Sequence, residues 1–350
     1  MKYLRWLLLP FSLLYGLVVL IRNWCYDVGW FKSTSFNLPV ISVGNLAVGG
    51  AGKSPMTEYL IRLLKQDYKV ATLSRGYGRE TKGFLVADAT TTAQQVGDEP
   101  AQFKQKFPDI TVAVCEDRVA GIEKLKADHN LILMDDAYQH RAVKPGLSIL
   151  LFDYNKLNKI DFLLPAGNMR EPISGKMRAD IMVVSKCPDN LSTDEQENIA
   201  AKLNPYPYQH LLFTSINYLP LEVFGQSATV NSDTRIYLLT GLAGTQPLEK
   251  YLKSISKDII HHKYPDHHQY TLKNITKLAE AFSADTTKNK AIVTTEKDAE
   301  RLKQPALFSI LQTLPVLVLP ISVKFINGGS NFDQLITSYV REYTTHSSVH

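Results

Sequence analysis

The chain has 350 residues, of which 45% are hydrophobic and 21% are charged, as in an ordinary globular protein. This length favours two domains over one. The formal net charge of +5 is uneven, because residues 1–32 carry Lys2, Arg5, Arg22 and Lys32 against Asp27 alone. The remainder is nearly balanced and has no basic run interleaved with aromatic residues, which argues against a nucleic-acid-binding protein.

The three cysteines, Cys25, Cys115 and Cys187, stand far apart and form no Cys-x-x-Cys pair. This spacing excludes a disulfide framework and a thiolate zinc cluster, and it is typical of a protein in a reducing cytosol.

Residues 6–21 form an uncharged apolar run between Arg5 and Arg22. Sixteen helical residues span about 24 Å, which is shorter than the ~30 Å hydrocarbon core of a bilayer. A signal peptide would need a small-residue cleavage site, which residues 21–24 do not supply. A tilted full span, a buried soluble helix and a helix lying at the membrane surface stay open. We expect the surface helix, in contact with the cytoplasmic side of a membrane.

The chain is organised around residues 40–55, where an apolar β-branched run leads through a glycine-rich turn into a helical pattern beginning near Met56. A strand, a glycine loop, Gly-Lys-Ser and a helix together form a cradle for nucleotide phosphates. Glycine lets backbone N–H groups converge on phosphate oxygens, and the helix N-terminus adds partial positive charge. Lys53 would reach the β- and γ-phosphates, and the Ser54 hydroxyl would hold Mg²⁺. The predicted nucleotide contacts are Val48, Gly49, Gly50, Ala51, Gly52, Lys53, Ser54 and Pro55.

This loop is a variant of the strict motif, because Ala47 stands where a glycine is expected five positions before Gly52. A chance glycine turn followed by Lys-Ser is the alternative. The strand-to-helix context favours phosphate binding over it.

Basic residues follow two later segments. The predicted strand 69–73 ends in Ser-Arg-Gly-Tyr-Gly-Arg, and ligands gather at the carboxyl ends of strands in open α/β sheets. Arg75 is therefore placed to meet an anion, although a solvated loop also explains it. A loop at 160–178, punctuated by glycine and proline, carries Arg170, whose guanidinium matches phosphate in a bidentate way and predicts a second phosphate clamp.

Acidic pairs occur at two points. Asp98 and Glu99 open a helix, where they either complement the helix dipole or serve in metal binding and general-base catalysis. The apolar run 131–134 ends in Asp135 and Asp136, which is typical of the carboxylate that organises Mg²⁺ in P-loop enzymes. A plain turn is the alternative there.

Strands and helices alternate after the loop, which predicts an α/β fold with a P-loop NTPase-like, mainly parallel sheet. Residues near 205–234 are richer in Pro, Tyr, Asn and Ser and mark the domain junction. The predicted parts are an apolar membrane-associated helix at 1–32, a P-loop kinase domain at 33–215, linker strands at 216–234, a smaller α/β domain at 235–343 and a tail at 344–350.

The second domain holds His261, His262, His267 and His268 within eight residues. No cysteine or carboxylate cluster supports a metal site there, and adjacent histidines on a strand point in opposite directions. A catalytic histidine and a plain surface loop remain the main interpretations.

Five segments together make the chain resemble the tetraacyldisaccharide 4′-kinase family of lipid A biosynthesis. They are the loop at 40–55, Gly97–Pro100, Asp135–His140, Leu164–Pro172 and Tyr264–His268. The resemblance runs over nearly the whole chain, including the apolar N-terminus and the Thr295–Asp298 segment. It implies transfer of the γ-phosphate of ATP, with Mg²⁺, to the 4′-hydroxyl of a disaccharide 1-phosphate carrying four acyl chains. The product would be the 1,4′-bisphosphate, lipid IVA.

A substrate with four acyl chains stays in the bilayer, so the resemblance also implies an enzyme at the cytoplasmic face of the inner membrane. By the same resemblance, Asp98 would be the general base and His267 its partner. The residues that would serve ATP and Mg²⁺ are Lys53, Ser54, Glu99, Asp135 and Asp136. Further phosphate and substrate contacts would come from Arg75, Tyr77, Arg118, Gln139 and Arg170. With Asp98 in the first domain and His267 in the second, we expect a site shared across the junction and assembled by closure.

Two rival functions stay open at this point. A membrane-attached P-loop ATPase or GTPase switch would hydrolyse nucleotide without a lipid acceptor. The GTPase form lacks an Asn-Lys-x-Asp motif, and a switch leaves the acceptor-side residues without a task. A soluble small-molecule kinase would instead bury the apolar N-terminus.

Overall fold

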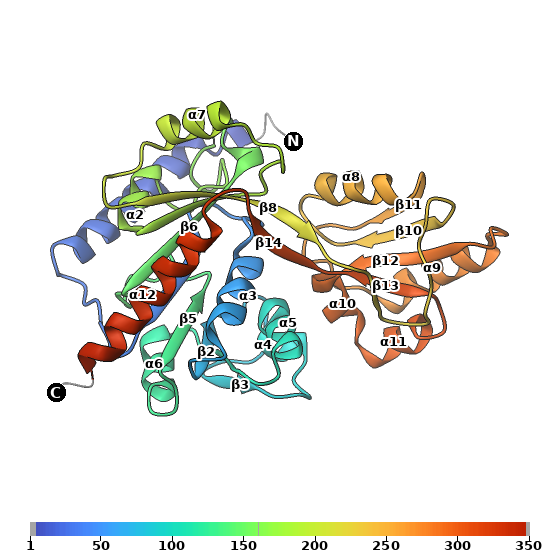
Figure 1. The fold of residues 1–350 in the computed structure, drawn as a ribbon, viewed down its shortest axis with the longest axis horizontal. Helices are drawn as coiled ribbons and strands as arrows, with labels where there is room; N and C mark the ends of the chain where they lie inside the picture. The colour runs from blue at the N-terminus through green and yellow to red at the C-terminus, as the bar shows by residue number, and fades with distance from the viewer. Residues whose placement is uncertain (1–4, 160, 348–350) are drawn as a thin grey trace. The chain divides into compact units, whose positions relative to one another are not determined.

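A computed structural model describes residues 5–159 and 161–347 of the chain (Figure 1). The chain divides into two units, which we describe separately. The first unit consists of Met1–Thr90, Phe103–Asn217 and Ser322–His350, and the second of Thr91–Gln102 and Tyr218–Ile321.

This division differs from the expected domains in two places. Thr91–Gln102 groups with the second unit, because Arg301 and Lys297 of that unit pair with Asp98 and Glu99. The expectation that Asp98 and His267 lie in different domains is therefore wrong. The C-terminal helix belongs to the first unit, where Tyr59 donates a 2.8 Å hydrogen bond to Asp333.

The first unit contains a sheet of nine strands, counted over the described residues. Its order is β14 (Ile321–Phe325), β8 (His210–Tyr218), β7 (Ile181–Ser185), β6 (Leu147–Asp153), β1 (Val40–Asn45), β5 (Leu131–Asp135), β2 (Val70–Ser74), β4 (Thr111–Val114) and β3 (Leu85–Ala87). From β8 to β4 each pair is parallel, whereas the edge strand β3 runs antiparallel to β4. The expected mainly parallel sheet is confirmed.

The central strand β1 has all six residues buried and lies between β5 and β6. A strand buried on both faces reads as a continuous apolar run, which is why Val40–Val43 carries almost no polar residue. Strands β1, β5, β6 and β7 are parallel neighbours, so Asn45, Asp135, Asp153 and Ser185 end them at one edge of the sheet. Ligands bind at this edge in open α/β sheets.

Helices cover both faces of this sheet. They are α2 (Leu9–Asp27), α3 (Lys53–Leu64), α6 (Arg118–Leu125), α7 (Thr193–Leu203) and α12 (Gly329–Ser347), with the short helices η1 (Tyr154–Lys156) and η2 (Ile173–Arg178). One buried cluster includes Leu73 and Ile122 and lies under α6, and another includes Val184 and Leu203 and lies under α7. Helix α12 crosses the sheet in Figure 1, and its Tyr343 donates a hydrogen bond to the carbonyl of Phe36.

The second unit is built on a five-stranded sheet, again counted over the described part of the chain. Its order is β11 (Asp258–Lys263), β10 (Arg235–Thr240), β12 (Lys290–Thr295), β13 (Val316–Leu319) and β9 (Glu222–Val223). Its helices are α8 (Gln246–Ile255), α9 (Leu272–Ala284), α10 (Glu296–Leu302) and α11 (Pro305–Leu311), and it includes α4 (Ala93–Val96) and the first turn of α5 (Asp98–Lys106).

Successive side chains of β10 point to opposite faces of this smaller sheet, and each set packs in its own buried cluster. Ile236 and Leu238 pack in one buried cluster with Leu252 of α8. Tyr237 and Leu239 pack in the other cluster with Ile275 of α9. Because apolar side chains of β10 point to both faces, helices cover the sheet on both sides. The predicted second α/β unit is confirmed.

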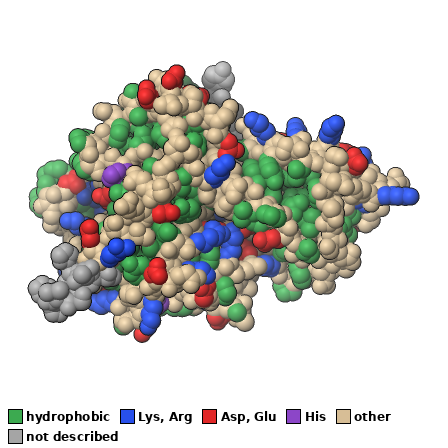
Figure 2. Space-filling model, viewed as in Figure 1, with side chains coloured by type: hydrophobic (Ala, Val, Ile, Leu, Met, Phe, Trp, Pro, Cys, Tyr) green, Lys and Arg blue, Asp and Glu red, His purple; other side chains and the backbone are tan. Residues whose placement is uncertain are grey.

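Most predicted elements of the chain occur within a few residues of their expected bounds. Helix α3 begins at Lys53, three residues before the expected start, and α12 continues through Ser347, into the expected tail. The last residues of that tail, 348–350, lie outside the described chain, as do residues 1–4 of the expected N-terminal segment. Basic and acidic side chains are interspersed over the face drawn in Figure 2.

Candidate active site

The glycine loop connects β1 to α3 at the carboxyl edge of the first sheet. Gly49 (φ +102°) and Gly52 (φ +83°) adopt backbone conformations that residues with a Cβ rarely adopt. Gly52 caps α3, so the helix N-terminus and its amide groups begin at Lys53. Ser54 is buried in the first turn. The predicted strand, loop and helix are all present.

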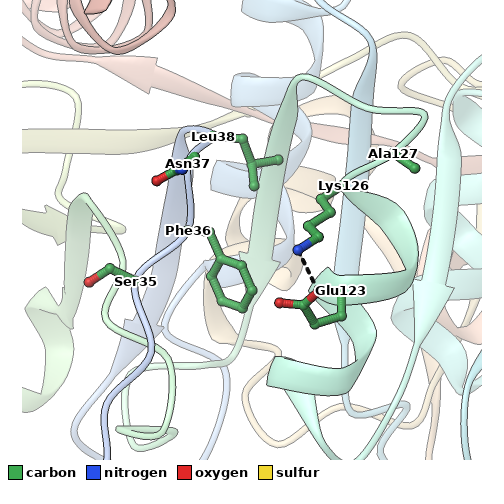
Figure 3. Close-up of a pocket in the computed structure, with 7 residues that line it drawn as sticks. All are labelled: Ser35, Phe36, Asn37, Leu38, Glu123, Lys126 and Ala127. Carbon is green, nitrogen blue, oxygen red and sulfur yellow. Dashed lines mark ion pairs between the residues drawn. The ribbon is translucent and has the colours of Figure 1, made fainter. Parts of the chain in front are cut away.

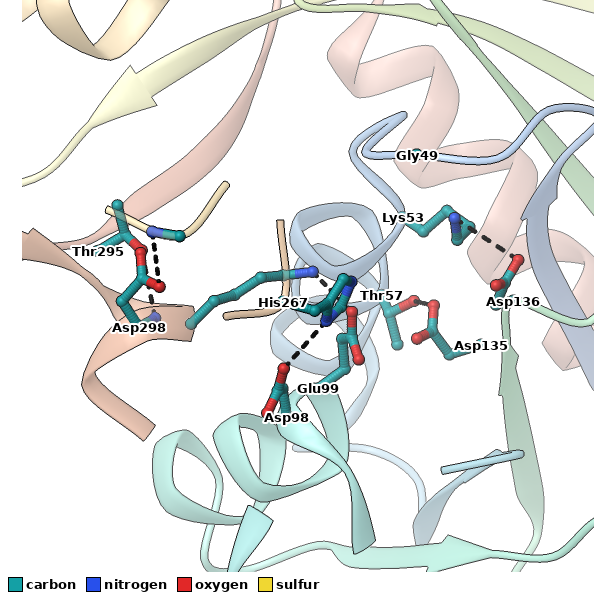
Figure 4. Close-up of polar contacts among 12 residues, drawn as sticks. Gly49, Lys53, Thr57, Asp98, Glu99, Asp135, Asp136, His267, Thr295 and Asp298 are labelled. Carbon is teal, nitrogen blue, oxygen red and sulfur yellow. Dashed lines mark hydrogen bonds and ion pairs between the residues drawn. The ribbon is translucent and has the colours of Figure 1, made fainter. Parts of the chain in front are cut away.

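Lys53, Asp136 and Arg170 form a charged cluster beside this loop. Figure 4 shows the Lys53–Asp136 pair. Lys53 Nζ lies 3.5 Å from Asp136 Oδ1 and 3.4 Å from Asn45 Oδ1. Arg170 Nη1 donates to both carboxylate oxygens of Asp136, at 2.9 and 3.1 Å. Burial opposes ionisation of this carboxyl, but the charges on Lys53 and Arg170 outweigh it and hold the pKa of Asp136 below its ordinary value.

Asp135 ends β5 and is nearly inaccessible to solvent. The Thr57 hydroxyl of α3 donates a 3.0 Å hydrogen bond to Asp135 Oδ1, which fixes the carboxylate against the loop helix (Figure 4). Thr57 was not among the residues singled out in the sequence. The sequence indicates its place at the site only through its position four residues after Lys53, which puts the two side chains on the same face of a helix.

The loop that carries Arg170 is held by the N-terminal helix α2. Ser12 Oγ donates to the carbonyl of Leu163, Tyr15 donates to the carbonyl of Arg170, and Asn23 donates to the buried carboxylate of Glu171. The buried residues of α2 are Ser12, Gly16, Val19 and Cys25, so the face that packs on the protein is narrow and made of small side chains. Most large apolar side chains of α2 are exposed, namely Phe11, Leu13, Leu14, Leu17, Val18, Leu20, Ile21 and Trp24. Helix α2 is the one helix, within the described residues, that is long and apolar enough to cross a membrane.

Arg118 is buried in the first unit close to the strand end that carries Arg75. Burial, together with the charge on Arg75, lowers the pKa of Arg118 to about 10. Burial and the charge on Arg118 also lower the pKa of His140 to about 4. Arg118 Nε and His140 Nε2 have no hydrogen-bond partner among the described residues. A buried guanidinium N–H without an acceptor, such as Arg118 Nε, is a donor that an anion satisfies.

The other predicted substrate residues lie differently. Tyr77 is exposed in the loop after β2. Gln139 donates through its side chain to the carbonyl of Asn45 at 2.7 Å and accepts at its backbone from Arg22. Gln139 thereby links the end of β1 to α2.

Asp98 and His267 meet in the second unit, with His267 Nδ1 3.2 Å from Asp98 Oδ2. Arg301, which the sequence analysis did not single out, donates from Nε and Nη2 to the same Oδ2 at 2.8 and 2.5 Å, and from Nη1 to Asp298 Oδ1 at 3.1 Å. Burial opposes ionisation of Asp98, but hydrogen bonds from His267 and Arg301 outweigh it and lower its pKa. The bond to Asp98 raises the pKa of His267.

The remaining predicted residues of the second unit have other partners. Glu99, expected near Mg²⁺, accepts a 2.7 Å hydrogen bond from Lys297 of the Thr295–Asp298 segment. His261 lies 2.8 Å from the Thr240 hydroxyl, and His268 lies 3.0 Å from Asn274 Oδ1. Throughout the described residues, no group of three His, Cys, Asp or Glu side chains is arranged to hold a metal ion. His267 is the histidine that meets a carboxylate named for catalysis.

A pocket of about 450 Å³ also lies in the first unit (Figure 3). Its lining residues are Ser35, Phe36, Asn37, Leu38, Glu123, Lys126 and Ala127. Lys126 is already paired with Glu123 at 2.5 Å. None of the predicted site residues lines this pocket, so we do not assign it to the active site.

Comparisons with known proteins agree with the resemblance seen in the sequence. A family model described as tetraacyldisaccharide-1-P 4′-kinase matches residues 4–341. Two proteins named tetraacyldisaccharide 4′-kinase, from Flavobacterium johnsoniae and Bacteroides thetaiotaomicron, are 46% and 44% identical to the chain. The first alignment covers 98% of this chain and 99% of the relative, and the second covers 99% and 96%.

A crystal structure of LpxK from Aquifex aeolicus in complex with ATP has a TM-score of 0.70 and 30% sequence identity, covering 96% of this chain and 99% of that one. An ATPase switch without a lipid acceptor is not favoured by these matches, which extend over the whole chain. Glycine loop, paired carboxylates and full-length similarity lead to one conclusion: the chain belongs to the tetraacyldisaccharide-1-P 4′-kinase family and is an ATP-dependent kinase.

Proposed function

We propose that this protein transfers the γ-phosphate of ATP to the 4′-hydroxyl of a tetraacyldisaccharide 1-phosphate, giving the 1,4′-bisphosphate of lipid A biosynthesis. The observation that carries the proposal is the charged cluster of Lys53, Asp136 and Arg170 at the glycine loop. Its two cations are held by a carboxylate that can release them to phosphate oxygens. Phosphoryl transfer needs mainly positioning and charge neutralisation, which such a cluster supplies.

The oxygen donors of the first unit fit ATP and Mg²⁺. Mg²⁺ takes few protein ligands and several phosphate or water oxygens. The Ser54 hydroxyl with the carboxylates of Asp135 and Asp136 is such a set, and we assign them to hold the ion. Bound there, Mg²⁺ would neutralise charge on the phosphates. Lys53 and the amides of the loop would bind the phosphates, and Arg170 would serve as the second clamp.

Asp98 and His267 supply the acid–base chemistry in this proposal. Asp98 is assigned as the general base for the acceptor hydroxyl and His267 as its partner. Their hydrogen bond, and the Arg301 contact that keeps Asp98 ionised, support the assignment. A carboxylate kept ionised is ready to accept a proton, although a lowered pKa makes it a weak base.

The group around Arg75, Arg118 and His140 is assigned to an anionic part of the acceptor, such as its 1-phosphate. The assignment is supported by Arg118 Nε and His140 Nε2, which lack a protein partner, and by burial and nearby positive charge, which lower the pKa of Arg118 and of His140. An arriving phosphate would satisfy both the hydrogen bonds and the charge.

Helix α2 is proposed to rest on the cytoplasmic face of the inner membrane. Its narrow face of small side chains is hydrogen-bonded through Ser12 and Tyr15 to the loop that carries Arg170, while most of its large apolar residues are exposed. A helix held along the protein in this way favours surface insertion over an independent span. Vesicle binding by a Leu14→Glu, Leu17→Glu variant tests this. Unchanged binding would overturn the surface helix.

The product of the reaction tests the proposed function. The full chain in detergent micelles would be incubated with Mg²⁺, ATP labelled at the γ-phosphate and an acylated disaccharide 1-phosphate. We expect label in the lipid, with mass spectrometry locating the new phosphate at the 4′-oxygen. A lipid already phosphorylated at that position is the matched control and should accept none. ATP consumption without labelled lipid would overturn the proposal.

A further inference from the structure

Four successive carbonyl groups of the glycine loop are held by donors from outside the loop or across it. Lys156 Nζ lies 3.2 Å from the carbonyl oxygen of Val48, and Lys186 Nζ donates to that of Gly50. Ser185 Oγ lies 2.8 Å from the carbonyl oxygen of Ala51. Gly49 accepts from the Ala51 amide at 3.0 Å and, more weakly, from the side chain of Asn45.

The amide groups of the same loop are placed differently. The N–H groups of Gly49, Gly50 and Gly52 have no hydrogen-bond partner in the described part of the chain. A trans peptide points its carbonyl and its N–H in opposite directions. A donor that holds the carbonyl of Val48 or Ala51 therefore turns the N–H of Gly49 or Gly52 the other way, away from that donor.

The three side chains are themselves fixed by the sheet. Ser185 is the buried last residue of β7, and its hydroxyl also lies 3.1 Å from the carbonyl oxygen of Phe152 in β6. Lys186 follows it with a left-handed backbone (φ +59°) and pairs with Asp153, the last residue of β6, at 3.0 Å. Lys156 ends the short helix η1 that follows β6. All three donors thus come from the ends of β6 and β7, the two strands that follow β1 on one side of the sheet.

We propose that Lys156, Ser185 and Lys186 are positioning residues of the phosphate loop. Lys156 and Ser185 hold the carbonyl groups of Val48 and Ala51 outward, so that the N–H groups of Gly49 and Gly52 face the phosphates of ATP before ATP binds, and Lys186 fixes the carbonyl group of Gly50 between them. The inference rests on the proposed role of this loop as the ATP site. Without these donors the loop carbonyls would be free to turn inward, where their negative ends repel phosphate. An ordered loop binds more tightly because less conformational entropy is lost on binding.

Charge-free variants of equal length test the proposal. The variants are Lys156→Met and Lys186→Met, with Ser185→Ala as a third, and Lys202→Met on the exposed face of α7 is the matched control. We expect hydrogen exchange at the two hydrogen-bonded loop amides of the ATP-free protein, those of Val48 and Ala51, to accelerate in the first three variants and to stay unchanged in the control. We also expect Kd and KM for ATP to rise about three- to tenfold, with kcat nearly unchanged.

Lys156 is exposed, so its variant will fold even where loss of the Asp153 pair harms Lys186→Met. Lys186→Arg keeps a donor and should recover most of the ATP affinity. Weaker ATP binding with unchanged loop exchange would mean that the lysines contact phosphate directly, and would overturn the positioning role. Unchanged exchange and unchanged affinity would overturn it as well. If Lys53→Ala also leaves ATP binding intact, the loop is not the ATP site and the proposed function itself fails.

Discussion

The two units each centre on a cation–carboxylate cluster, and the clusters differ in exposure. In the first unit, the side chains of Lys53, Asp136 and Arg170 keep 13%, 32% and 27% of their surface exposed. In the second, those of Arg301 and Asp98 keep 1% and 10%. An accessible pair exchanges its partners for a ligand at little cost, whereas a buried pair stays closed because an unpaired buried charge is unfavourable. We therefore interpret the first cluster as one that binds and the second as one that holds a carboxylate in place.

The largest effect should come from opening the buried cluster. Arg301→Met leaves Asp98 and Asp298 without their shared cation, and we expect the free energy of unfolding to fall by about 3–5 kcal/mol. Lys253→Met, at an exposed position of α8, should change it by less than about 0.5 kcal/mol. Urea unfolding followed by circular dichroism measures both. A loss below about 1 kcal/mol for Arg301→Met would remove the distinction between the two clusters.

The exposed cluster should show the opposite behaviour. Lys53→Ala removes a charge assigned to the transferring phosphate, and we expect kcat to fall by about 10²–10³. Its stability should stay near that of the native protein, since the Lys53–Asp136 pair is partly exposed. Steady-state kinetics and urea unfolding of the same preparation give both values, with Lys202→Ala as control. A variant that loses stability rather than activity would make Lys53 a structural residue.

Asp98 and His267 should act as one unit. We expect Asp98→Asn and His267→Gln each to lower kcat by about 10², at the lower end for general-base catalysis because Arg301 already weakens the base. The double variant should be little slower than either single one. Rate constants of the four proteins at saturating ATP complete the cycle. If the fold-loss of kcat in the double variant equals the product of the two single losses, the two residues act in separate steps.

The two clusters also differ in how far the sequence predicted them. The loop residues, Lys53 and Asp135–Asp136 follow from a contiguous motif and from a strand that ends in acid, both of which are local patterns. Arg301 is 203 positions from Asp98, and the local sequence around a single arginine in a helix does not indicate which carboxylate it pairs with. Its role depends on Thr91–Gln102 packing with the second unit, a tertiary event that no local pattern encodes.

The same limit applies to elements of the fold. Strands with long apolar runs, such as β1 and β5, were predicted because burial on both faces leaves a continuous pattern. The edge strand β14 has no fully buried residue and was not predicted. Its pairing with β8 makes it a strand, and its composition carries no buried apolar run that would indicate one. Lys156 and Lys186 were missed for a related reason, because an isolated lysine after a strand does not reveal which carbonyl it meets.

The smallest expected effect is a pH dependence of opposite sign in the two units. The pKa of His140 is lowered to about 4, chiefly by burial, while that of His267 is raised by its bond to Asp98. Between about pH 6.5 and pH 4, His140 is protonated in the unfolded chain but not in the folded one. His140 therefore lowers the free energy of unfolding as the pH falls. His267 acts in reverse, because its contribution is complete below the unfolded pKa and is lost as the pH rises through the folded one.

Histidine substitutions separate these contributions. We expect His140→Gln to reduce the loss of unfolding free energy between pH 7 and pH 5 by about 1 kcal/mol, less than the full shift implies because the ring keeps some contact with solvent. His267→Gln should instead flatten the decline in stability above the ordinary pKa of histidine. NMR titration of the two imidazoles gives the pKa values directly. Equal pKa values for the two rings would contradict the assignment, because the carboxylate beside His267 and the cations around His140 would then have no effect on their histidines.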